Sequence, residues 1–471
     1  MRSLPALLAA VVVLASVAGV AVADPLSGAA VSTADAGPFD PGVGASDSVA
    51  QQTDPAQQTD SGAVQLRVLD VPTGQVSGST VERASIDVGP SLGFASNTTR
   101  ARIQTLSMVE KIRTAEDQSV RQRLILGELN RIEQRVITLR SQQAAAIESY
   151  ANGAITGRQL LIRLAEVDAT ARELERRRVR LSALAQETED FAIDQSRIAA
   201  AERELDTFTG PVRSHAVAVL EGEAPPARFS VTTGQDSVVL TTLLEDRWVR
   251  EVYRGDLRRR TGSSMDPETA LNVTASSYPD IWTLKRNSTE VVGSGDSFRV
   301  SVTHRGGTLT AFIDSGSQNV FKEFQTRELS SMELGAARTS VRDGLRLTVN
   351  RSYPGAPLQI RLTRDSTGEP VDANITLGLA DQDRSDFVGR TGEDGTLRTL
   401  TPREPFTVTA IQGNAVVIVQ VEPGSIPRVN PTTVNRTAIG STTRGSANGS
   451  PSDAVASGRS PAFSPPMALT G

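Results

Sequence analysis

The stretch from Leu129 to Leu184 decides the fold of this chain: LNRIEQRVITLRSQQAAAIESYANGAITGRQLLIRLAEVDATARELERRRVRLSAL. Apolar or small residues recur in it at spacings of three and four positions, which is the period of one face of a helix. Asn152-Gly153 interrupts the pattern, and Thr156 with Gln159 three places later forms a capping box that starts a second helix. Two long antiparallel helices are therefore predicted. Their packed residues are Leu129, Ile132, Val136, Leu139, Ala146, Tyr150, Leu160, Leu164, Val167, Ala171, Leu174, Leu181 and Leu184.

Two shorter helices are expected after this hairpin. Asp194 is a suitable N-cap for a helix that ends at Thr207, and Gly210-Pro211 separates it from a short helix that ends at Glu221. With the hairpin they predict an antiparallel helical bundle, or coiled-coil hairpin, over residues 98–222. Self-association through this helical region is one role that we expect of it.

The hydrophobic period changes from helical to alternating after residue 225. Strand candidates with one helix, from Asp266-Pro267 to before Tyr278, predict a small α+β domain over residues 226–332. Eight short runs separated by turns such as Asp343-Gly344 and Asp394-Gly395 predict an immunoglobulin-like β-sandwich over residues 337–421. The predicted fold class is therefore a multidomain α + β protein with a helical bundle first and a β-sandwich last.

The two ends of the chain have a different composition. Residues 1–23 resemble a signal peptide, because Arg2 precedes an apolar stretch and Ala21-Val22-Ala23 ends it. A retained anchor is the alternative, and after cleavage no transmembrane anchor is expected. Residues 24–97 and 422–471 hold few bulky apolar residues and are predicted to be a disordered spacer and a disordered Ser/Thr/Gly/Pro-rich tail. Within the spacer, Val64–Val71 is expected to form a short strand that docks on the body or on a partner.

Composition excludes several classes of chemistry. Among 471 residues there is no cysteine, so thiolate nucleophiles, disulfides and Cys-based zinc sites are impossible. A net charge of −5 gives no nucleic-acid footprint. Only Lys111, Lys285 and Lys322 are lysines, and the other 46 of the 49 basic residues are arginines. Two explanations of this excess of arginine over lysine are open. Guanidinium groups are needed to pair with carboxylates, or the codons of a GC-rich genome favour arginine.

Few residues suggest a specific site, and no catalytic or cofactor-binding residue is predicted. His215 and His304 lie in no triad context, and the chain has no G-x-S-x-G. Asp381, Asp383 and Asp386 could offer oxygen ligands to calcium, or could form a solvated loop. Tyr278 and Trp282 could form a partner-binding patch, or could belong to the core. Candidate glycosylation sites are Asn97, Asn272, Asn287, Asn350, Asn374, Asn435 and Asn448.

Three stretches resemble a group of exported haloarchaeal proteins that have no assigned activity. They are the hairpin at Ala145–Gly153, the Gly210-Pro211-Val212 join and the run from Leu309 to Glu323. The segment TLTAFIDSGSQNVFKE, residues 308–323, is similar to PepSY-type domains, which occur in protease propeptides and extracellular modulators. Gly368-Glu369-Pro370-Val371 and Gly392-Glu393-Asp394-Gly395 resemble transthyretin-like sandwich modules.

Three hypotheses about function follow. The first is a secreted or cell-surface-associated, non-enzymatic protein that scaffolds or binds envelope components or other proteins. The second is a modulator or inhibitor of an extracellular protease that acts through the PepSY-like domain at 226–332. The third is a hydrolase that depends on a pair of carboxylates, although the sequence alone selects no such pair from 54 acidic residues.

Overall fold

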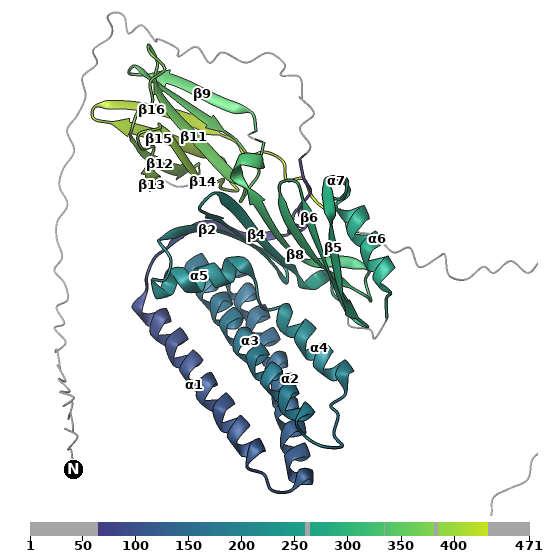
Figure 1. Ribbon diagram of the computed structural model, residues 1–471. Helices are drawn as coiled ribbons and strands as arrows, with labels where there is room; N and C mark the ends of the chain where they lie inside the picture. Colours follow the sequence, from purple (N-terminus) through teal and green to yellow (C-terminus); the bar gives the residue numbers. More distant parts are fainter. Residues whose placement is uncertain (1–64, 260–263, 334, 381–384, 432–471) are drawn as a thin grey trace, which may run out of the picture. The chain divides into compact units, whose positions relative to one another are not determined.

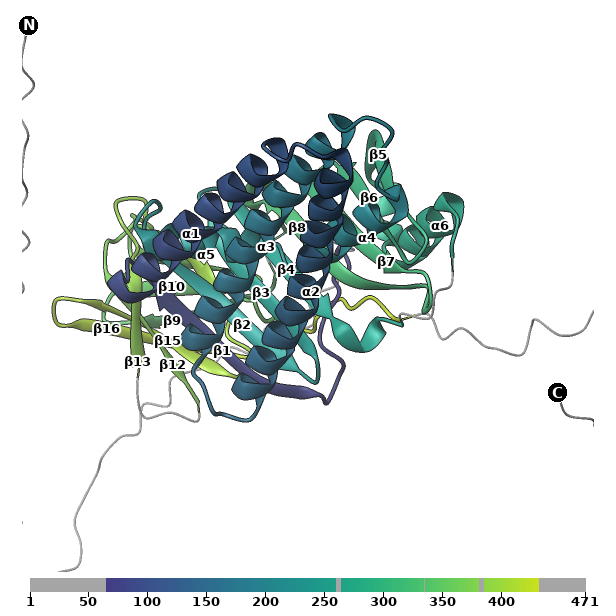
Figure 2. The same cartoon turned by 90° about the horizontal axis from the view of Figure 1, so that it is seen from below.

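The computed structural model describes residues 65–259, 264–333, 335–380 and 385–431, and every structural statement below concerns this part. A layer of helices covers one face of an eight-stranded antiparallel sheet, and a β-sandwich follows in the chain (Figure 1). The view from below in Figure 2 shows the helices lying across the strands. The predicted order of a helical region followed by an immunoglobulin-like sandwich is therefore confirmed.

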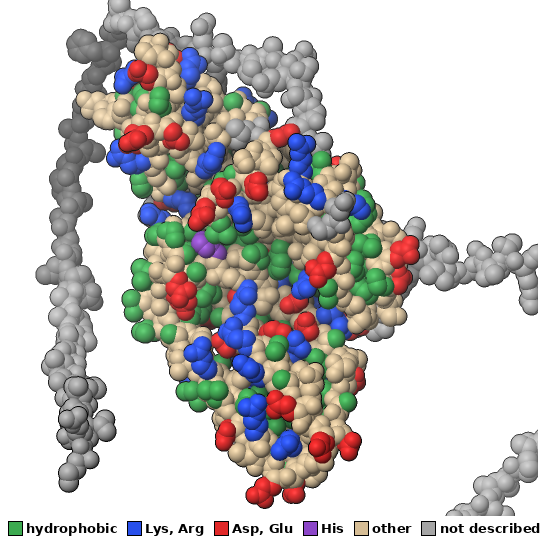
Figure 3. Space-filling model, viewed as in Figure 1, with side chains coloured by type: hydrophobic (Ala, Val, Ile, Leu, Met, Phe, Trp, Pro, Cys, Tyr) green, Lys and Arg blue, Asp and Glu red, His purple; other side chains and the backbone are tan. Residues whose placement is uncertain are grey.

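The helical layer contains the predicted hairpin. Its helices α2 (Gln118–Ala151) and α3 (Gly157–Gln186) pack together, and Leu129, Leu139, Leu160 and Leu164 have no exposed surface. The capping box at Thr156 is present in full. Asp194 caps α4 as predicted. The remaining helices are α1 (Val88–Arg113), α4 (Gln195–Asp206) and α5 (Pro211–Glu221). The outward surface of this layer carries charges of both signs (Figure 3).

The expected disordered spacer is wrong for residues 65–97, and the expected disordered tail is wrong for residues 422–431, which contact the strap described below. Residues 76–97 form strand β1 (Val76–Ala84) and the start of α1. The strand sequence VSGSTVERA is too polar to reveal itself, because its order comes from antiparallel pairing with β2 along its whole length. The helices also do not form a separate bundle. Leu164 and Val219 share one hydrophobic core with Phe229 and Leu240 of the sheet.

The eight-stranded sheet has the order β1-β2-β3-β4-β8-β7-β6-β5. The strands β1–β4 and the strands β5–β8 thus form two halves that meet where β4 pairs with β8. Helices α6 (Pro267–Ser277) and α7 (Pro279–Thr283) lie on the face of the sheet opposite α1–α5. The two central strands are buried on both faces. The strands are β2 (Ala227–Gly234), β3 (Ser237–Leu244), β4 (Arg247–Arg254), β5 (Lys285–Ser294), β6 (Ser297–His304), β7 (Gly307–Asp314) and β8 (Asn319–Glu328).

The C-terminal domain is the predicted sandwich of two four-stranded sheets, ordered β14-β11-β10-β9 and β13-β12-β15-β16. Alternate residues of both sheets form its core. It contacts the larger sheet at Trp248, whose indole nitrogen donates a 2.8 Å hydrogen bond to the carbonyl of Gly355. Its strands are β9 (Ala337–Arg342), β10 (Leu345–Asn350), β11 (Pro357–Arg364), β12 (Asn374–Leu379), β13 (Ser385–Arg390), β14 (Thr396–Leu400), β15 (Phe406–Gln412) and β16 (Ala415–Val421).

The two ends of the described chain lie side by side. Residues 66–71, called the strap here, run in extended form over the face of the sheet that carries α6, and Val68 pairs with Arg428 in a parallel bridge. The amide of Val68 donates to the carbonyl of Pro427 at 2.8 Å, and that of Val429 donates to the carbonyl of Val68 at 2.9 Å. The expected docking of this segment on the body is thus observed, although as a bridge rather than a full strand.

His304, at the end of β6, gives the fold a testable dependence on pH. The side chain is 2% exposed, and burial together with the positive charge of Arg327 lowers its pKa to about 4. The unfolded chain, with a histidine pKa of about 6.5, then binds a proton that the folded chain does not, so stability falls as pH falls from 6.5 to 4. We expect the wild type to lose about 3 kcal/mol more than His304→Gln over this window. Denaturant titrations at several pH values check this, and parallel curves for the two proteins would contradict it.

A buried polar centre as candidate functional site

The central strands β4 and β8 carry ionisable side chains on both faces of the sheet. Glu251 and Lys322 point to the helices, whereas Arg250 and Glu323 point to the strap, and each is at most 1% exposed. The alternation of side chains along a strand produces this arrangement. A buried ion is costly unless it is paired and hydrogen-bonded, so each face must supply partners.

Lys322 binds the C-terminal end of α4. Its ammonium nitrogen donates to the carbonyls of Asp206 and Thr207 at 2.8 Å and of Thr209 at 2.5 Å. Carbonyl oxygens at a helix C-terminus carry partial negative charge, which stabilises a cation there. An ammonium group can direct three donors at three separate acceptors, while the donors of a guanidinium are fixed in one plane.

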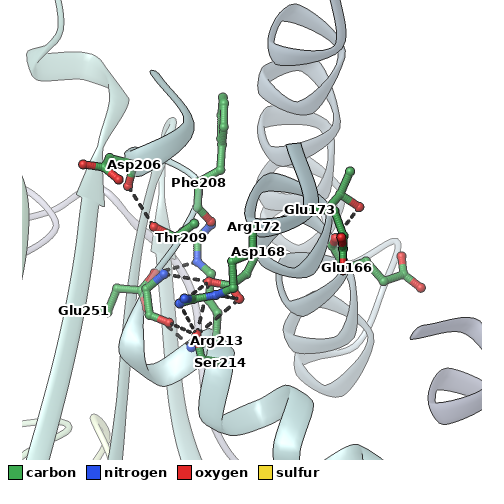
Figure 4. Close-up of polar contacts among 12 residues, drawn as sticks. Glu166, Asp168, Arg172, Glu173, Asp206, Phe208, Thr209, Arg213, Ser214 and Glu251 are labelled. Carbon is green, nitrogen blue, oxygen red and sulfur yellow. Dashed lines mark hydrogen bonds and ion pairs between the residues drawn. The ribbon is translucent and has the colours of Figure 1, made fainter. Parts of the chain in front are cut away.

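Arg213, at the start of α5, is the second cation on the helix side. It has no exposed surface, and its Nε lies 2.5 Å from Oε1 of Glu251. Its Nη1 donates to Oε1 of Gln143 at 2.6 Å and to the carbonyl of Phe208 at 3.0 Å. Figure 4 shows Arg213 and Glu251 meeting where the α4–α5 connection crosses the sheet.

Asp168 of α3 holds the same connection from the other side. Its Oδ1 accepts the amide of Gly210 at 2.8 Å, and its carboxylate also accepts from Arg172 and from the hydroxyl of Ser214 (Figure 4). Residues 206–214 are therefore held between α3 and the central strands. We call Asp168, Arg213, Glu251 and Lys322 with this connection the helix-side centre.

Burial lowers the pKa of Lys322 to about 7, Arg213 acts in the same direction, and the charge of Glu251 opposes both. An amine with such a pKa often marks a catalytic site. Here its three donors are directed at carbonyls of the chain itself, and the group has no exposed surface. The geometry therefore assigns Lys322 to holding α4 against the sheet.

On the opposite face, charged and polar side chains bind the backbone of the strap. Oε2 of Glu323 accepts the amide of Leu69 at 2.7 Å. Four strap carbonyls receive side-chain donors from β4 and β8: Leu66 from Arg327, Arg67 from Gln325, Leu69 from Arg250 and Asp70 from Arg254. The sheet thus binds the strap through the backbone of the strap, as in the binding of an added peptide strand. Here, however, side chains of the sheet make the hydrogen bonds, whereas backbone groups make them when a strand is added.

Asp70 is the acidic residue of the strap, and it is 3% exposed. Its Oδ1 accepts from Arg250 at 3.0 Å, while its Oδ2 accepts from Arg428 at 3.2 Å and lies 3.6 Å from Nη2 of Arg403. These arginines belong to the sheet, the C-terminal segment and the sandwich, so one carboxylate connects three parts of the chain.

The proposed aromatic patch is wrong for Tyr278. This side chain has no exposed surface, and its hydroxyl donates to Oε2 of Glu323 at 2.6 Å. Trp282 is half-buried against the same core, with Nζ of Lys285 3.9 Å from its ring centroid. These aromatic residues pack in the core. The short helices α6 and α7 have few other large side chains that could cover the sheet.

A groove lies beside the helix-side centre, between α4 and the β5–β6 hairpin. Its volume is about 220 Å³, with Phe298, Phe312 and Phe321 among its apolar lining and Arg203 and Asp206 among its charged lining. Burial raises the pKa of the Asp206 carboxyl, and the ion pair with Arg299 at 3.0 Å opposes this shift. A groove of this size accommodates a few water molecules or a small ligand.

The other predicted sites are only partly described. Asp381 and Asp383 lie outside the described residues, Asp386 is exposed in β13, and the described residues contain no group of acids and histidines that could hold a metal ion. Asn97, Asn272 and Asn374 are exposed, whereas Asn350 is half-buried and donates to the carbonyl of Gly335 at 3.2 Å. Asn287 lies in β5, and Asn435 and Asn448 lie outside the described residues. Calcium binding and glycosylation stay predictions.

Sequence reasoning missed the helix-side centre and the strap network. The rarity of lysine was a signal, since a lysine kept at position 322 in an arginine-rich chain indicates a special geometry. The strand RWVREVYR was another, because charges alternate in it with large apolar residues on both faces. No pattern in the sequence pairs Arg213 with Glu251 or the strap with β8.

Three family models match the chain. Residues 1–225 match a domain of unknown function (DUF7096), residues 229–333 a family of unknown function (DUF7094) and residues 336–419 an archaeal fibronectin-III type-like domain. Together with the fold, these matches fit an archaeal multidomain protein with an immunoglobulin-like domain over residues 336–419. None of them indicates an enzyme family, and the PepSY likeness stays a prediction.

Comparisons with curated proteins and with solved structures gave no match. In the described ranges, no helix combines the length and the hydropathy that crossing a membrane requires.

Gly210 provides a test of the helix-side centre. A Cβ at this position would overlap the carboxylate of Glu251, and the extended backbone there (φ −170°) places no other demand on the residue. We expect Gly210→Ala to lower the free energy of unfolding by about 2–4 kcal/mol, because it displaces a buried ion pair. Gly127→Ala is the control: nothing lies near a Cβ there, and the helix should gain roughly 0.5–1 kcal/mol. Equal effects of the two substitutions in denaturant titrations would show that Gly210 is not constrained by Glu251.

Lys322 can be tested by replacement with methionine and with arginine. We expect each variant to lose about 2–4 kcal/mol of stability, because three buried carbonyls lose donors or receive them in the wrong geometry. Lys111→Met, at an exposed position of α1, should change stability by less than about 0.5 kcal/mol. Thermal and denaturant unfolding measure the differences, and a Lys322→Arg variant as stable as the wild type would refute the role of ammonium geometry.

Proposed function

We propose that the protein is exported through residues 1–23 and acts at the cell envelope as a non-enzymatic binding or scaffolding protein. The observation that carries the proposal is the use of its buried ionisable groups. Lys322, Glu323 and Arg250 direct their hydrogen bonds at the backbone of the chain itself and so fix the strap and the α4–α5 connection. These groups stabilise the two irregular segments that cover the sheet, the strap and the α4–α5 connection. A role in the stability of the fold is compatible with a protein that acts by binding other molecules at its surface.

The sandwich offers a surface for binding. Phe387, Thr376, Thr409 and Ile418 are register neighbours in a row across the sheet β13-β12-β15-β16. Phe387 is 48% and Ile418 43% exposed, and the flanking residues Val388, Val417 and Val419 point into the core. We call this row the outer face of the sandwich. Phe387 and Ile418 stand on the two edge strands of this face, with Thr376 and Thr409 between them. Exposed apolar side chains on one face support a role in contacts with other molecules. The match to a fibronectin-III type-like domain supports the same role by analogy of fold alone.

Sedimentation with the cell-envelope fraction of the archaeon that encodes the chain tests this proposal. We expect the purified protein to sediment with the fraction. We expect the double substitution Phe387→Ser with Ile418→Ser to weaken binding by roughly tenfold, since a few large apolar side chains carry most of the energy of such contacts. Arg361→Ser, at an exposed position of β11, is the control and should bind like the wild type. Failure of the wild type to sediment would overturn the proposal, and equal binding of all variants would overturn the role of the outer face.

A further inference from the structure

Helix α1 is apolar on two opposite faces. Phe94, Met108 and Ile112 are buried against the other helices. On the far side Val88, Leu92, Ile103 and Leu106 are exposed by 69%, 65%, 62% and 63%. At 100° per residue these four lie within about 60° of one another around the helix axis. Apolar side chains are visible over α1 in Figure 3.

The exposed side of α1 also has a hollow into which side chains of a second helix can insert. A shallow hollow of about 550 Å³ lies against Leu92, Ala95, Thr99 and Ile103. Leu92 and Ile103 are the large apolar side chains of its lining, Ala95 and Thr99 lie between them in the sequence, and the rest of the lining is polar or charged: Ser96, Arg100 and Gln104. Projecting side chains of a facing helix insert into hollows of this kind when helices pair. We call Val88, Leu92, Ala95, Thr99, Ile103 and Leu106 the outer stripe.

We propose that the outer stripe pairs with the outer stripe of a second copy of this chain, antiparallel and centred on Thr99. In this register Leu92 of each copy faces Leu106 of the other, and Ala95 faces Ile103. The large Ile103 thus fills the space above the small Ala95, twice, as the two-fold symmetry of an isologous dimer requires. From Leu92 to Leu106 the stripe is self-complementary in size about Thr99, whereas Val88 faces Glu110 of the other copy.

The helix dipoles favour the antiparallel orientation over the parallel one. In the antiparallel pair the positive N-terminal end of each α1 lies beside the negative C-terminal end of the other copy. Asn97 lies about 160° around the helix from Thr99, the centre of the stripe, so a glycan there leaves the contact free.

The segment that precedes the described part offers a poorer occupant for the stripe. Residues 24–64, which precede the described part, are rich in Gln, Ser, Asp and Gly and hold few bulky apolar side chains. They cannot supply the matching set of large residues at helical spacing. A second α1 supplies Leu92, Ile103 and Leu106 in the required places.

The absence of cysteine from the chain makes a direct test available. Thr99→Cys places the only thiol of each copy on the two-fold axis, so mild oxidation with copper phenanthroline should link two copies by a disulfide. Ser141→Cys, at an exposed position of α2, is the matched control. We expect roughly tenfold more linked dimer for Thr99→Cys, because pairing raises the local concentration of its thiol. Equal, low yields from both proteins would overturn the proposal.

A mixing experiment tests the register. Proteins that carry Leu92→Cys and Leu106→Cys should crosslink efficiently when they are mixed and poorly when each is oxidised alone. Efficient crosslinking of Leu92→Cys with itself would identify a parallel pair and overturn the antiparallel register.

The molar mass of the unmodified protein provides the third readout. Light scattering should give twice the mass of one chain at micromolar concentration, and one mass for the variant Leu92→Glu with Ile103→Glu, whose buried charges weaken dimerisation by roughly 100-fold. Both residues are exposed in a single copy, so circular dichroism and the unfolding midpoint should stay unchanged at dilutions where both proteins are monomeric. A monomeric wild type across the concentration range overturns the proposal. The envelope experiment above measures a different surface, so the two proposals can fail independently.

Discussion

The pairing of β4 with β8 is the constraint on which the rest of the described structure depends. The strands β1–β4 and β5–β8 form one sheet only through this pair. Because the pair is central, both of its faces are covered, and Glu251, Lys322, Arg250 and Glu323 are buried with it. A buried ion without partners costs several kcal/mol, so apolar cover alone would not stabilise the sheet. Each face therefore needs a cover segment that brings its own polar groups.

The two segments that cover the central strands, the end of α4 and the strap, are irregular. Because they are irregular, they have free backbone groups that can pair with the buried side chains. In the interior of a helix the backbone carbonyls already accept hydrogen bonds from the helix itself. The carbonyls at the end of α4 and in the strap are free to accept hydrogen bonds from side chains. Lys322 uses the first set and Arg327, Gln325, Arg250 and Arg254 use the second. The position of the strap then fixes the C-terminal segment through the Val68–Arg428 bridge. Residues more than 350 positions apart are connected in this way.

Local patterns predicted what local interactions determine. The capping box at Thr156, the N-cap at Asp194 and the alternating strands of the sandwich were readable because neighbours in sequence produce them. β1 was not readable, since its polar residues are ordered by β2 some 150 positions away. Tyr278 was misjudged as a surface residue because clustering of aromatics does not tell a core from a patch. The pairing of Arg213 with Glu251 depends on how α5 crosses the sheet, which no spacing in the sequence reveals.

The choice between arginine and lysine also follows from geometry at the buried positions. Asp70 offers two oxygens to guanidinium groups from three parts of the chain, and planar donors can approach a carboxylate together in that way. Three carbonyls that converge on one point at the end of α4 instead require an ammonium, and lysine stands there in a chain with only three lysines. Codon bias can explain a general excess of arginine. Of the three lysines, Lys111 and Lys285 are exposed, and Lys322 stands where three carbonyls require an ammonium. The geometry of the helix-side centre accounts for lysine at this buried position.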